Sequence, residues 1–474
     1  MQYVCDRGVP YGQSQILSIT GSSEEIELAN NRVIIVGSGP AGIFTALTLK
    51  DAGLREIIVL EQGEDITSRR RKTGRDILCG WGGAGAFSDG KLTLSPEIGG
   101  FLGEFIPRHE LQSLLTEADQ IYLHYGAPSK TFGSASEETE NLTHMAKQAG
   151  MEFIPTEIRH VGTENWARIL KRMRDDLNGD VGVQTKTRVQ RLLCEEGRVC
   201  GVALEGGKKL KAEFVIVAPG RGGADWVKQE MKRLGLSSSP NPVDIGVRVE
   251  APAAILKNLT DPAYESKLIY YANTFDDKVR TFCMNPYGEV VTEESNGIVT
   301  VNGHSYARKR TENTNFAILV SSTFTEPFDD PIGYGRIIAQ LANLLGEGVI
   351  IQRLGDLMEG RRSTPERIAR CITRPTLPSA TPGDLSFVLP YRYLRDIMEM
   401  LEALDKIAPG IFSRHTLLYG VEVKFYSNRI KLSSCLESQV RNLFFTGDGA
   451  GVTRGLLQAS ASGILAAREI LKRV

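Results

Sequence analysis

Val33-Ile-Ile-Val-Gly-Ser-Gly-Pro-Ala-Gly-Ile-Phe44 is the stretch of sequence that decides the fold. Its first four residues are apolar and mostly β-branched, which predicts a strand buried on both faces, as in a parallel sheet. Three glycines with the spacing G-x-G-x-x-G follow, and residues 41–50 predict an apolar-rich helix with Pro40 in its first turn. A strand, a tight turn and a helix are therefore expected in direct succession.

The three glycines of this turn have different expected roles. Gly37 allows the sharp turn, Gly39 lets a pyrophosphate approach the backbone, and Gly42 lets the helix pack closely on the strand. The N–H groups of the turn and the positive end of the helix dipole would then hold the phosphates. The other expected contacts in this turn are Ser38, Pro40 and Ala41.

The residues after the helix strengthen this interpretation. Gly53 ends the helix, Ile57-Ile-Val-Leu60 predicts a second buried strand, and Glu61 and Gln62 follow at its carboxyl end. An acid about 20 residues past the glycines is where a ribose hydroxyl pair is bound in dinucleotide sites. This context favours a dinucleotide site over a plain βαβ unit with a tight turn.

Length and composition indicate a globular chain of two or three domains. The 474 residues are 41% hydrophobic and 24% charged, with a formal net charge of -1, which gives no electrostatic case for a nucleic-acid partner. No apolar run approaches the ~20 residues that span a bilayer, and the N-terminus lacks a signal-peptide pattern. The seven cysteines form no C-x-x-C pair, so we expect reduced thiols, no metal site and a cytoplasmic location.

A glycine-dense segment, Cys79 to Lys91, follows the second strand and is too rich in glycine for a helix interior. Such a backbone can press against a flat ligand. The expected cofactor contacts here are Gly82, Gly83, Ala84, Gly85 and Ser88, with Asp89 and Lys91 beside them. Arg69, which opens the basic run 69–72, belongs either to a solvated turn or to a contact with the cofactor's phosphates, and we include it among the candidate contacts.

The middle of the first domain is expected to be helical over about 101–180. Residues 181–204 then predict a β-hairpin whose edge near Val189 would pair with adenine. The strand 214–218 follows, and its end, Ala218-Pro-Gly220, would pack beside the nucleotide.

A late strand and turn favour FAD over NAD as the expected cofactor. Residues 443–446 predict a short strand, followed by Gly447-Asp-Gly-Ala-Gly451 and a final helix over 455–472. The chain thereby returns to the first domain and would direct a second helix N-terminus at the ligand. There, Asp448 would hydrogen-bond to the ribityl chain or to the pyrophosphate side of the cofactor. The N–H groups of Gly455, Leu456 and Leu457 would polarise a carbonyl of the isoalloxazine.

These elements predict an α/β fold in which a Rossmann-like nucleotide domain is interrupted by a second unit. We expect an N-terminal arm over 1–30, an FAD-binding domain over 31–224 and 436–474, and an inserted α+β substrate domain over 225–435. Such an arrangement places the ligand cleft between the domains.

Four longer stretches carry a resemblance to a known family. They are Gly82 to Leu92, Phe282 to Gly288, Gly420 to Ser427 and Gly447 to Gly455. The set resembles the glutathione-reductase-like flavoproteins, which have two dinucleotide-binding domains. It is similar most closely to the poorly characterised FAD-dependent dehydrogenases. The resemblance implies a glutathione-reductase-type FAD domain and redox chemistry, without a known substrate.

A second nucleotide site is not expected, because Gly220-Arg-Gly-Gly223 has the wrong spacing and its strand already lies beside FAD. NAD(P)H would therefore act only as a transient reductant at the flavin, and FAD would be bound non-covalently.

Two side chains are candidates for proton chemistry at the flavin. Cys283 would act as a weak acid, a nucleophile or a contact at the flavin face, although a free cysteine is more often inert core. His304 lies on an expected turn and could titrate near neutral pH, although a surface histidine is the more common case.

Glu422 and Lys424 are spaced by two on a predicted strand and so point to the same side. The lysine would stabilise reduced flavin or orient an acidic substrate; a structural ion pair is the alternative.

The leading hypothesis is an FAD-dependent oxidoreductase that transfers a hydride between flavin N5 and a small organic substrate. The alternatives are a flavin monooxygenase or halogenase, a flavin-dependent RNA-modifying protein, and a non-catalytic FAD-binding protein. The expected partner is a small molecule rather than nucleic acid or membrane, and a homo-oligomer or an external electron partner is left open.

Overall fold

The computed structural model describes residues 30–69, 78–88, 90–239, 241–295, 297–306, 309–324, 327–328, 330–424 and 429–474. The expected N-terminal arm, except Asn30, lies outside these ranges. So do Asp89, residues 70–72 of the basic run, and the last residues of the stretch Gly420 to Ser427.

The first sheet forms around the opening motif, because residues 33–36 of its strand are buried and the strand pairs on both edges. β1 (Asn30–Val36) pairs in parallel with β2 (Ile57–Leu60) and with β9 (Lys209–Val217). β6 (Gly182–Gln184) extends the parallel order beyond β2, and β21 (Leu443–Phe445) pairs in parallel with β9. This parallel sheet brings the early and the late glycine turns to one edge.

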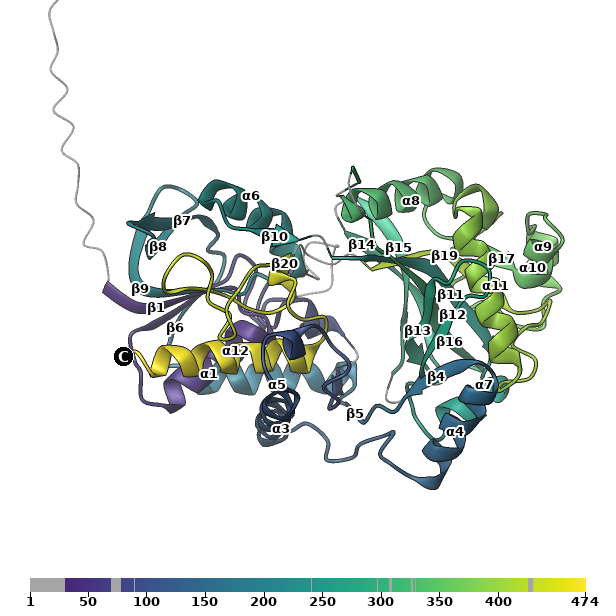
Figure 1. The fold of residues 1–474 in the computed structure, drawn as a ribbon, viewed down its shortest axis with the longest axis horizontal. Helices are drawn as coiled ribbons and strands as arrows, with labels where there is room; N and C mark the ends of the chain where they lie inside the picture. Colours follow the sequence, from purple (N-terminus) through teal and green to yellow (C-terminus); the bar gives the residue numbers. More distant parts are fainter. Residues whose placement is uncertain are drawn as a thin grey trace, which may run out of the picture.

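Helices cover this sheet and bring an early and a late segment of the chain together (Figure 1). α1 (Pro40–Asp51) and α12 (Leu456–Leu471) are in direct contact. A Cβ added to Gly463 would lie 2.2 Å from the carbonyl oxygen of Ala41, and the Thr45 hydroxyl donates to the Gly463 carbonyl at 3.1 Å. The final helix therefore packs on the first unit.

An antiparallel hairpin extends the first sheet, formed by β7 (Val189–Glu195) and β8 (Arg198–Leu204). The hairpin is shorter than the expected 181–204. The backbone turns at Lys186, which has φ +54°, so β6 leaves the hairpin and pairs with β2 instead.

The second sheet is antiparallel at every pairing except β17 with β18, so it is not a second parallel nucleotide-binding sheet. Its order is β18-β17-β19-β11-β16-β13-β12-β4. The strands are β4 (Met151–Ile154), β11 (Val243–Pro252), β12 (Lys267–Tyr271), β13 (Lys278–Asn285), β16 (Asn313–Ser322), β17 (Ile350–Arg353), β18 (Thr381–Pro382) and β19 (Leu417–Lys424).

Helices pack on this second sheet around a separate apolar core. They are α4 (Glu137–Gln148), α7 (Ala253–Thr260), α8 (Pro331–Gly346) and α11 (Tyr391–Asp405). Figure 1 shows α4, α7 and α11 on the side of the sheet that faces away from the first unit. The opposite face of the sheet is therefore turned toward the nucleotide-type unit.

The chain divides between the two cores differently from the expectation. α4 and β4 lie within the range 101–180, which we expected to be a helical part of the first domain, but β4 pairs with β12 in the second sheet. Met151 and Phe153 are buried in the second core while Glu152 is exposed, which is the alternation of a one-sided strand. Conversely, α6 (Ala224–Leu234) packs on the first core.

Of the α-helices described in the expected helical range, α3 (Arg108–His124) and α5 (Thr163–Asp176) pack on the first core. The remaining elements are short or lie between the two sheets. They are β3 (Lys91–Thr93), β5 (Ile158–His160), β10 (Ser238–Ser239), β14 (Glu289–Ser295), β15 (Ile298–His304), β20 (Arg429–Ile430), α9 (Leu354–Met358), α10 (Pro365–Ala369), and 3₁₀ turns at Gly83–Phe87, Leu102–Glu104, Arg221–Gly223, Leu385–Phe387 and Asp448–Ala450.

Among the residues that the structure describes, no helix combines the length and apolar character needed to cross a membrane. The six cysteines in those ranges are free thiols.

Candidate functional site

A cavity of about 820 Å³ lies between the glycine turn of the first unit and the inner face of the second sheet. Its volume is within the range of sites that hold small ligands and cofactors. Both glycine turns, the 83–88 segment and strands of the second sheet line it. The early and the late motif therefore meet in one cavity.

The three glycines of the first turn differ in the space around them. A Cβ on Gly37 would lie 2.2 Å from the carbonyl oxygen of Ala218, and one on Gly42 would lie 2.0 Å from the carbonyl oxygen of Gly37. Around Gly39, by contrast, an added Cβ would meet nothing within 4 Å, and Gly39 lines the cavity. Gly37 and Gly42 thus allow tight packing, and Gly39 leaves room for a ligand.

Glu61 ties three loops together beside this turn. One carboxylate oxygen accepts from the Ser38 N–H at 3.0 Å and from the Ser38 hydroxyl at 2.8 Å. The other accepts from the N–H groups of Gly63 at 2.8 Å and Gly80 at 2.9 Å. Glu61 is buried but lines the cavity together with Gln62.

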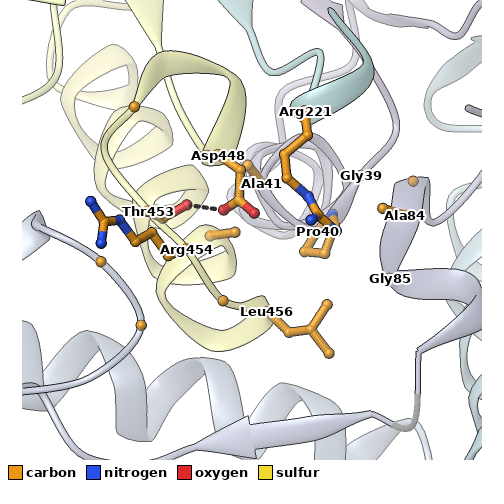
Figure 2. A pocket seen from close by; sticks show the side chains of 18 of the residues that line it. Gly39, Pro40, Ala41, Ala84, Gly85, Arg221, Asp448, Thr453, Arg454 and Leu456 are labelled. Atoms are coloured by element: carbon orange, nitrogen blue, oxygen red, sulfur yellow. Dashed lines mark hydrogen bonds between the residues drawn. The ribbon is translucent and has the colours of Figure 1, made fainter. Parts of the chain in front are cut away.

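The glycine-dense segment packs directly on the first turn. A Cβ on Gly83 would lie 3.1 Å from the Gly39 Cα, and one on Gly85 would lie 2.7 Å from a methyl carbon of Leu456. Figure 2 shows Ala84 and Gly85 near Gly39. The expected contacts that line this end of the cavity are Gly83, Ala84, Gly85, Ser88, Val189, Ala218 and Gly220.

The late turn, which begins at Gly447, places the carboxylate of Asp448 near the start of α1 (Figure 2). Gly447 has φ +73°, and the Thr453 hydroxyl donates to Asp448 at 2.6 Å. Burial raises the pKa of Asp448, and the charges of Arg221 and Arg454 act against that rise. Figure 2 shows these two arginines on opposite sides of the carboxylate.

Gly455 is the N-cap of α12, and both it and Leu456 line the cavity. The first N–H groups of a helix have no partner within the helix, so this end of α12 offers donors and the positive end of its dipole to the cavity.

The second sheet contributes side chains from alternate strand positions. On β13 these are Lys278, Arg280 and Phe282, and on β12 they are Lys267 and Ile269. A strand presents every second residue to one face, so both strands turn the same face to the cavity. Further lining residues of this unit are Ile154, Glu265, Cys283, Asn302, Ser321, Thr323 and Lys424.

Cys283 lies in the cavity wall, in a backbone conformation with φ +46° that is rare for non-glycine residues. The Lys91 ammonium lies 4.0 Å from its sulfur, donates to the Met284 carbonyl at 2.8 Å and is 3.3 Å from the Glu265 carboxylate. The Cys283 N–H donates to the same carboxylate at 3.1 Å. The thiol is therefore part of a fixed Lys91–Glu265 cluster.

The expected Glu422–Lys424 pair is present, with 2.9 Å between the ammonium and a carboxylate oxygen. Lys424 lines the cavity, but Glu422 is fully buried behind it. The main partner of Glu422 is Arg248, which donates twice, each time at 2.7 Å. Arg248 also donates to the Cys283 carbonyl at 2.9 Å, so one buried network supports both cavity residues.

Several expected site residues do not line the cavity. Arg69 instead donates to the carbonyls of Gly80 at 3.3 Å and Trp81 at 2.7 Å and lies over the ring of Phe87, so it holds a loop. Gly82 is packed against Leu170, where a Cβ would lie 2.4 Å from a methyl carbon. His304 lies at the end of the β14–β15 hairpin. The others outside the lining are Gly42, Glu422 and Leu457.

Other cavity residues were missed or not placed in the site. Lys267 and Arg280 line the cavity but were not among the expected site residues, and Arg248, which is buried behind the cavity on β11, was not expected in the supporting network. The alternation of Lys278, Arg280 and Phe282 is the signal that would have found the cavity face. In the described part of the chain, no group of three or more His, Cys, Asp or Glu residues could hold a metal ion.

Two family models match the chain. One is described as an FAD-dependent protein, C-terminal domain-like, and covers residues 242–425; the other is an FAD binding domain and covers residues 32–74. An uncharacterized protein of Clostridium beijerinckii is 30% identical over 497 residues, which span 97% of this chain and 84% of the relative.

Solved structures with a similar arrangement are more distant. L-proline dehydrogenase from P. horikoshii is 11% identical with a TM-score of 0.40, covering 94% of each chain. Glycine oxidase from Geobacillus kaustophilus is 13% identical with a TM-score of 0.40, covering 94% of this chain and 95% of the other. Likeness at this level carries no argument about activity.

Proposed function

The chain belongs to the family of poorly characterised FAD-dependent oxidoreductases, and we propose that it exchanges a hydride between its flavin and a small organic substrate held between the two sheets. It is a mixed α/β protein with a Rossmann-like FAD-binding domain and FAD as its cofactor. The observation that carries the proposal is the single cavity that runs from the Gly39 turn to the inner face of the second sheet. A cofactor in the first unit and a substrate on the second would meet inside it.

The residues present fit FAD. The open space at Gly39 accommodates a diphosphate against the N-terminus of α1, and Glu61 offers carboxylate oxygens to ribose hydroxyls. Val189, which begins β7 and lines the same cavity, would supply strand-edge backbone for adenine. At the other end, Asp448 and the N-terminus of α12 face the flavin half of the molecule.

Bound flavin accepts or gives a hydride at N5, and the chain supplies the groups around it. Lys424 and Cys283 are the proposed catalytic residues, because both lie in the cavity wall. Lys424 would place a positive charge near negative charge that develops in the cavity, and Cys283 with Lys91 would supply a site for a proton. Glu422 is a positioning residue that acts through Lys424, and His304 has no role in this proposal.

The test is to load the purified protein with FAD and follow the visible flavin band without oxygen. We expect the band to bleach with an organic donor, or the dithionite-reduced flavin to be reoxidised by an organic acceptor. A flavin that exchanges electrons with no organic compound would contradict the proposal. Rapid bleaching by NADH or NADPH alone, followed by peroxide release in air, would assign an oxygenase instead.

A further inference from the structure

The second-sheet side of the cavity carries an excess of positive charge. Its cationic face consists of Lys267 on β12, Lys278 and Arg280 on β13, and Lys424 on β19. The acidic residue that lines this side is Glu265, and it is already engaged by Lys91 and by the Cys283 N–H. The face is therefore suited to an anion rather than to a neutral ligand.

Two of these four cations have a buried carboxylate partner. Arg280 donates to Asp244, which also accepts from the Ser321 hydroxyl at 2.6 Å, and Lys424 pairs with Glu422. The ammonium groups of Lys267 and Lys278 form no hydrogen bond or ion pair with any residue within the described ranges. Arg280 is thus held in a fixed orientation, and Lys267 next to it has no ion-pair partner within the described ranges.

Lys267 is partly removed from water and lies near a like charge. Burial, with the charge of Arg280 added, lowers its pKa to about 7, and the carboxylates of Glu265 and Asp244 only partly oppose this. Lys278 adds a further like charge. An anion bound between these cations would relieve this unfavourable arrangement.

Apolar side chains lie among the charges. Ile154 is the cross-strand partner of Lys267, and Ile269 is the cross-strand partner of Arg280. The ring of Phe282 lies 4.8 Å from the Arg280 guanidinium carbon and 5.6 Å from the Lys424 ammonium. The surface therefore fits an anion that has an apolar body.

We propose that Lys267 and Arg280 form a subsite for the carboxylate of the substrate, whose apolar body lies against Phe282 and Ile269. This inference rests on the proposed function, since it assigns the substrate class of the same cavity. An arginine fork matches a carboxylate in a two-bond arrangement. A phosphate is disfavoured because a sheet face offers no free backbone N–H groups, whereas a helix N-terminus does.

The experiment titrates the oxidised FAD-loaded protein with matched probes and reads the difference spectrum of the flavin. The probes are phenylacetate against phenylacetamide, butyrate against butyramide, and phenyl phosphate. We expect at least one acid to bind about tenfold or more tightly than its amide, and more tightly than phenyl phosphate. Equal binding of every acid and its amide, no binding of any acid, or tightest binding of the phosphate would overturn the subsite.

Variants test whether Lys267 and Arg280 account for the preference for acids over amides. Lys267→Gln and Arg280→Gln should each lose about tenfold or more in acid affinity and leave amide affinity within about twofold. Lys267→Arg should retain acid binding, and Lys208→Gln, an exposed lysine away from the cavity, should behave like wild type. Unchanged acid affinity in Lys267→Gln, or loss of FAD from it, would contradict the proposal.

Calorimetry distinguishes a role of the Lys267 charge in carboxylate binding from a purely structural role of this residue. At pH 8 Lys267 is largely neutral, so carboxylate binding should take up a proton, measured in two buffers of different ionisation enthalpy. Lys267→Gln should show no such uptake, and uptake unchanged in this variant would contradict the assignment. These titrations use resting oxidised flavin, so they can fail while the redox test succeeds, and the reverse.

Discussion

Gly39 faces open space while its neighbours in the same turn are packed against backbone, and this difference gives a test at a single residue. Gly39→Val should weaken FAD binding about 100-fold or more, because the side chain would occupy the place of the diphosphate. The fold should be unaffected, since Gly39 has φ -73° and an added Cβ meets nothing. Fluorescence titration with FAD measures the first effect, and thermal unfolding of the apoprotein measures the second.

Gly42→Ala is the matched contrast. Its Cβ would lie 2.0 Å from the Gly37 carbonyl oxygen, so the apoprotein itself should lose stability, by about 1–3 kcal/mol. Equal stability of the two variants would contradict the different roles assigned to these glycines.

Cys283 gives the second prediction at this scale. Replacing it with Ala should slow reduction of the flavin by substrate about tenfold, or about 1.4 kcal/mol in transition-state stabilisation. Stopped-flow bleaching measures the rate, and Cys435→Ala, which lies outside the cavity, is the control. An unchanged rate in Cys283→Ala would remove the thiol from the proposal.

The tight packing of Gly37 and Gly42 could be predicted from sequence because it depends on a few consecutive residues. The Glu422–Lys424 pair could be predicted for the same reason, since strand spacing alone places both on one side. Arg248 could not be predicted, because its contact with Glu422 depends on β11 pairing with β19 far along the chain. Lys267 and Arg280 also meet only through the order of the second sheet.

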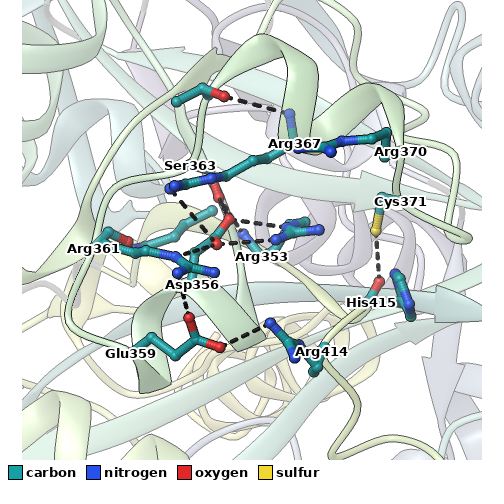
Figure 3. Close-up of polar contacts among 12 residues, drawn as sticks. Arg353, Asp356, Glu359, Arg361, Ser363, Arg367, Arg370, Cys371, Arg414 and His415 are labelled. Atoms are coloured by element: carbon teal, nitrogen blue, oxygen red, sulfur yellow. Dashed lines mark hydrogen bonds and ion pairs between the residues drawn. The ribbon is translucent and has the colours of Figure 1, made fainter.

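At the scale of elements, an arginine cluster joins β17, α9 and α10 at the edge of the second unit (Figure 3). Asp356 is fully buried there and accepts from Arg353 at 2.9 Å on both oxygens, from the Ser363 hydroxyl at 2.7 Å and from Arg361 at 3.0 Å. Burial opposes ionisation, but these hydrogen bonds outweigh it and hold the pKa of Asp356 well below its usual range. The carboxylate thus fastens these elements to each other.

Asp356→Asn should therefore destabilise the protein by about 3–5 kcal/mol at pH 7, because Arg353, the buried cation of the cluster, loses its counter-charge. The folded pKa lies below the unfolded value, so the wild-type contribution is complete above the usual carboxyl pKa and is lost as the pH falls below it. Urea unfolding from pH 6 to pH 3 should show a smaller decline for the variant.

The control for this prediction is Arg414→Gln. Arg414 pairs with Glu359 at an exposed position, so this substitution should lower the free energy of unfolding by less than about 1 kcal/mol. A pH profile of Asp356→Asn that parallels wild type would contradict the role of the carboxylate.

At the scale of the whole molecule, the chain passes between the two units more often than a simple insertion would. Residues 137–154 join the second core, the chain then returns to the first unit, and it leaves again for residues 243–424. The range expected to be helical, about 101–180, includes β4, so neither this strand nor its pairing with β12 was predicted. One-sided alternation shows that a strand is half-buried and leaves its partner undetermined.

The fourth prediction follows from that placement. A fragment of residues 242–425 should not fold alone, because it lacks α4 and exposes the edge of β12 that β4 covers. Fusing residues 137–154 to it through a flexible linker should restore a cooperative thermal transition in circular dichroism. Cooperative unfolding of the unfused fragment would contradict this account.

The repeated passage of the backbone also affects how the protein responds to being cut. If a protease cleaves one of the peptide segments between the two units, the other segments still connect the units. The contact between α1 and α12 also remains. Nicked protein should therefore migrate as separate bands in denaturing gels yet elute as one yellow species under native conditions.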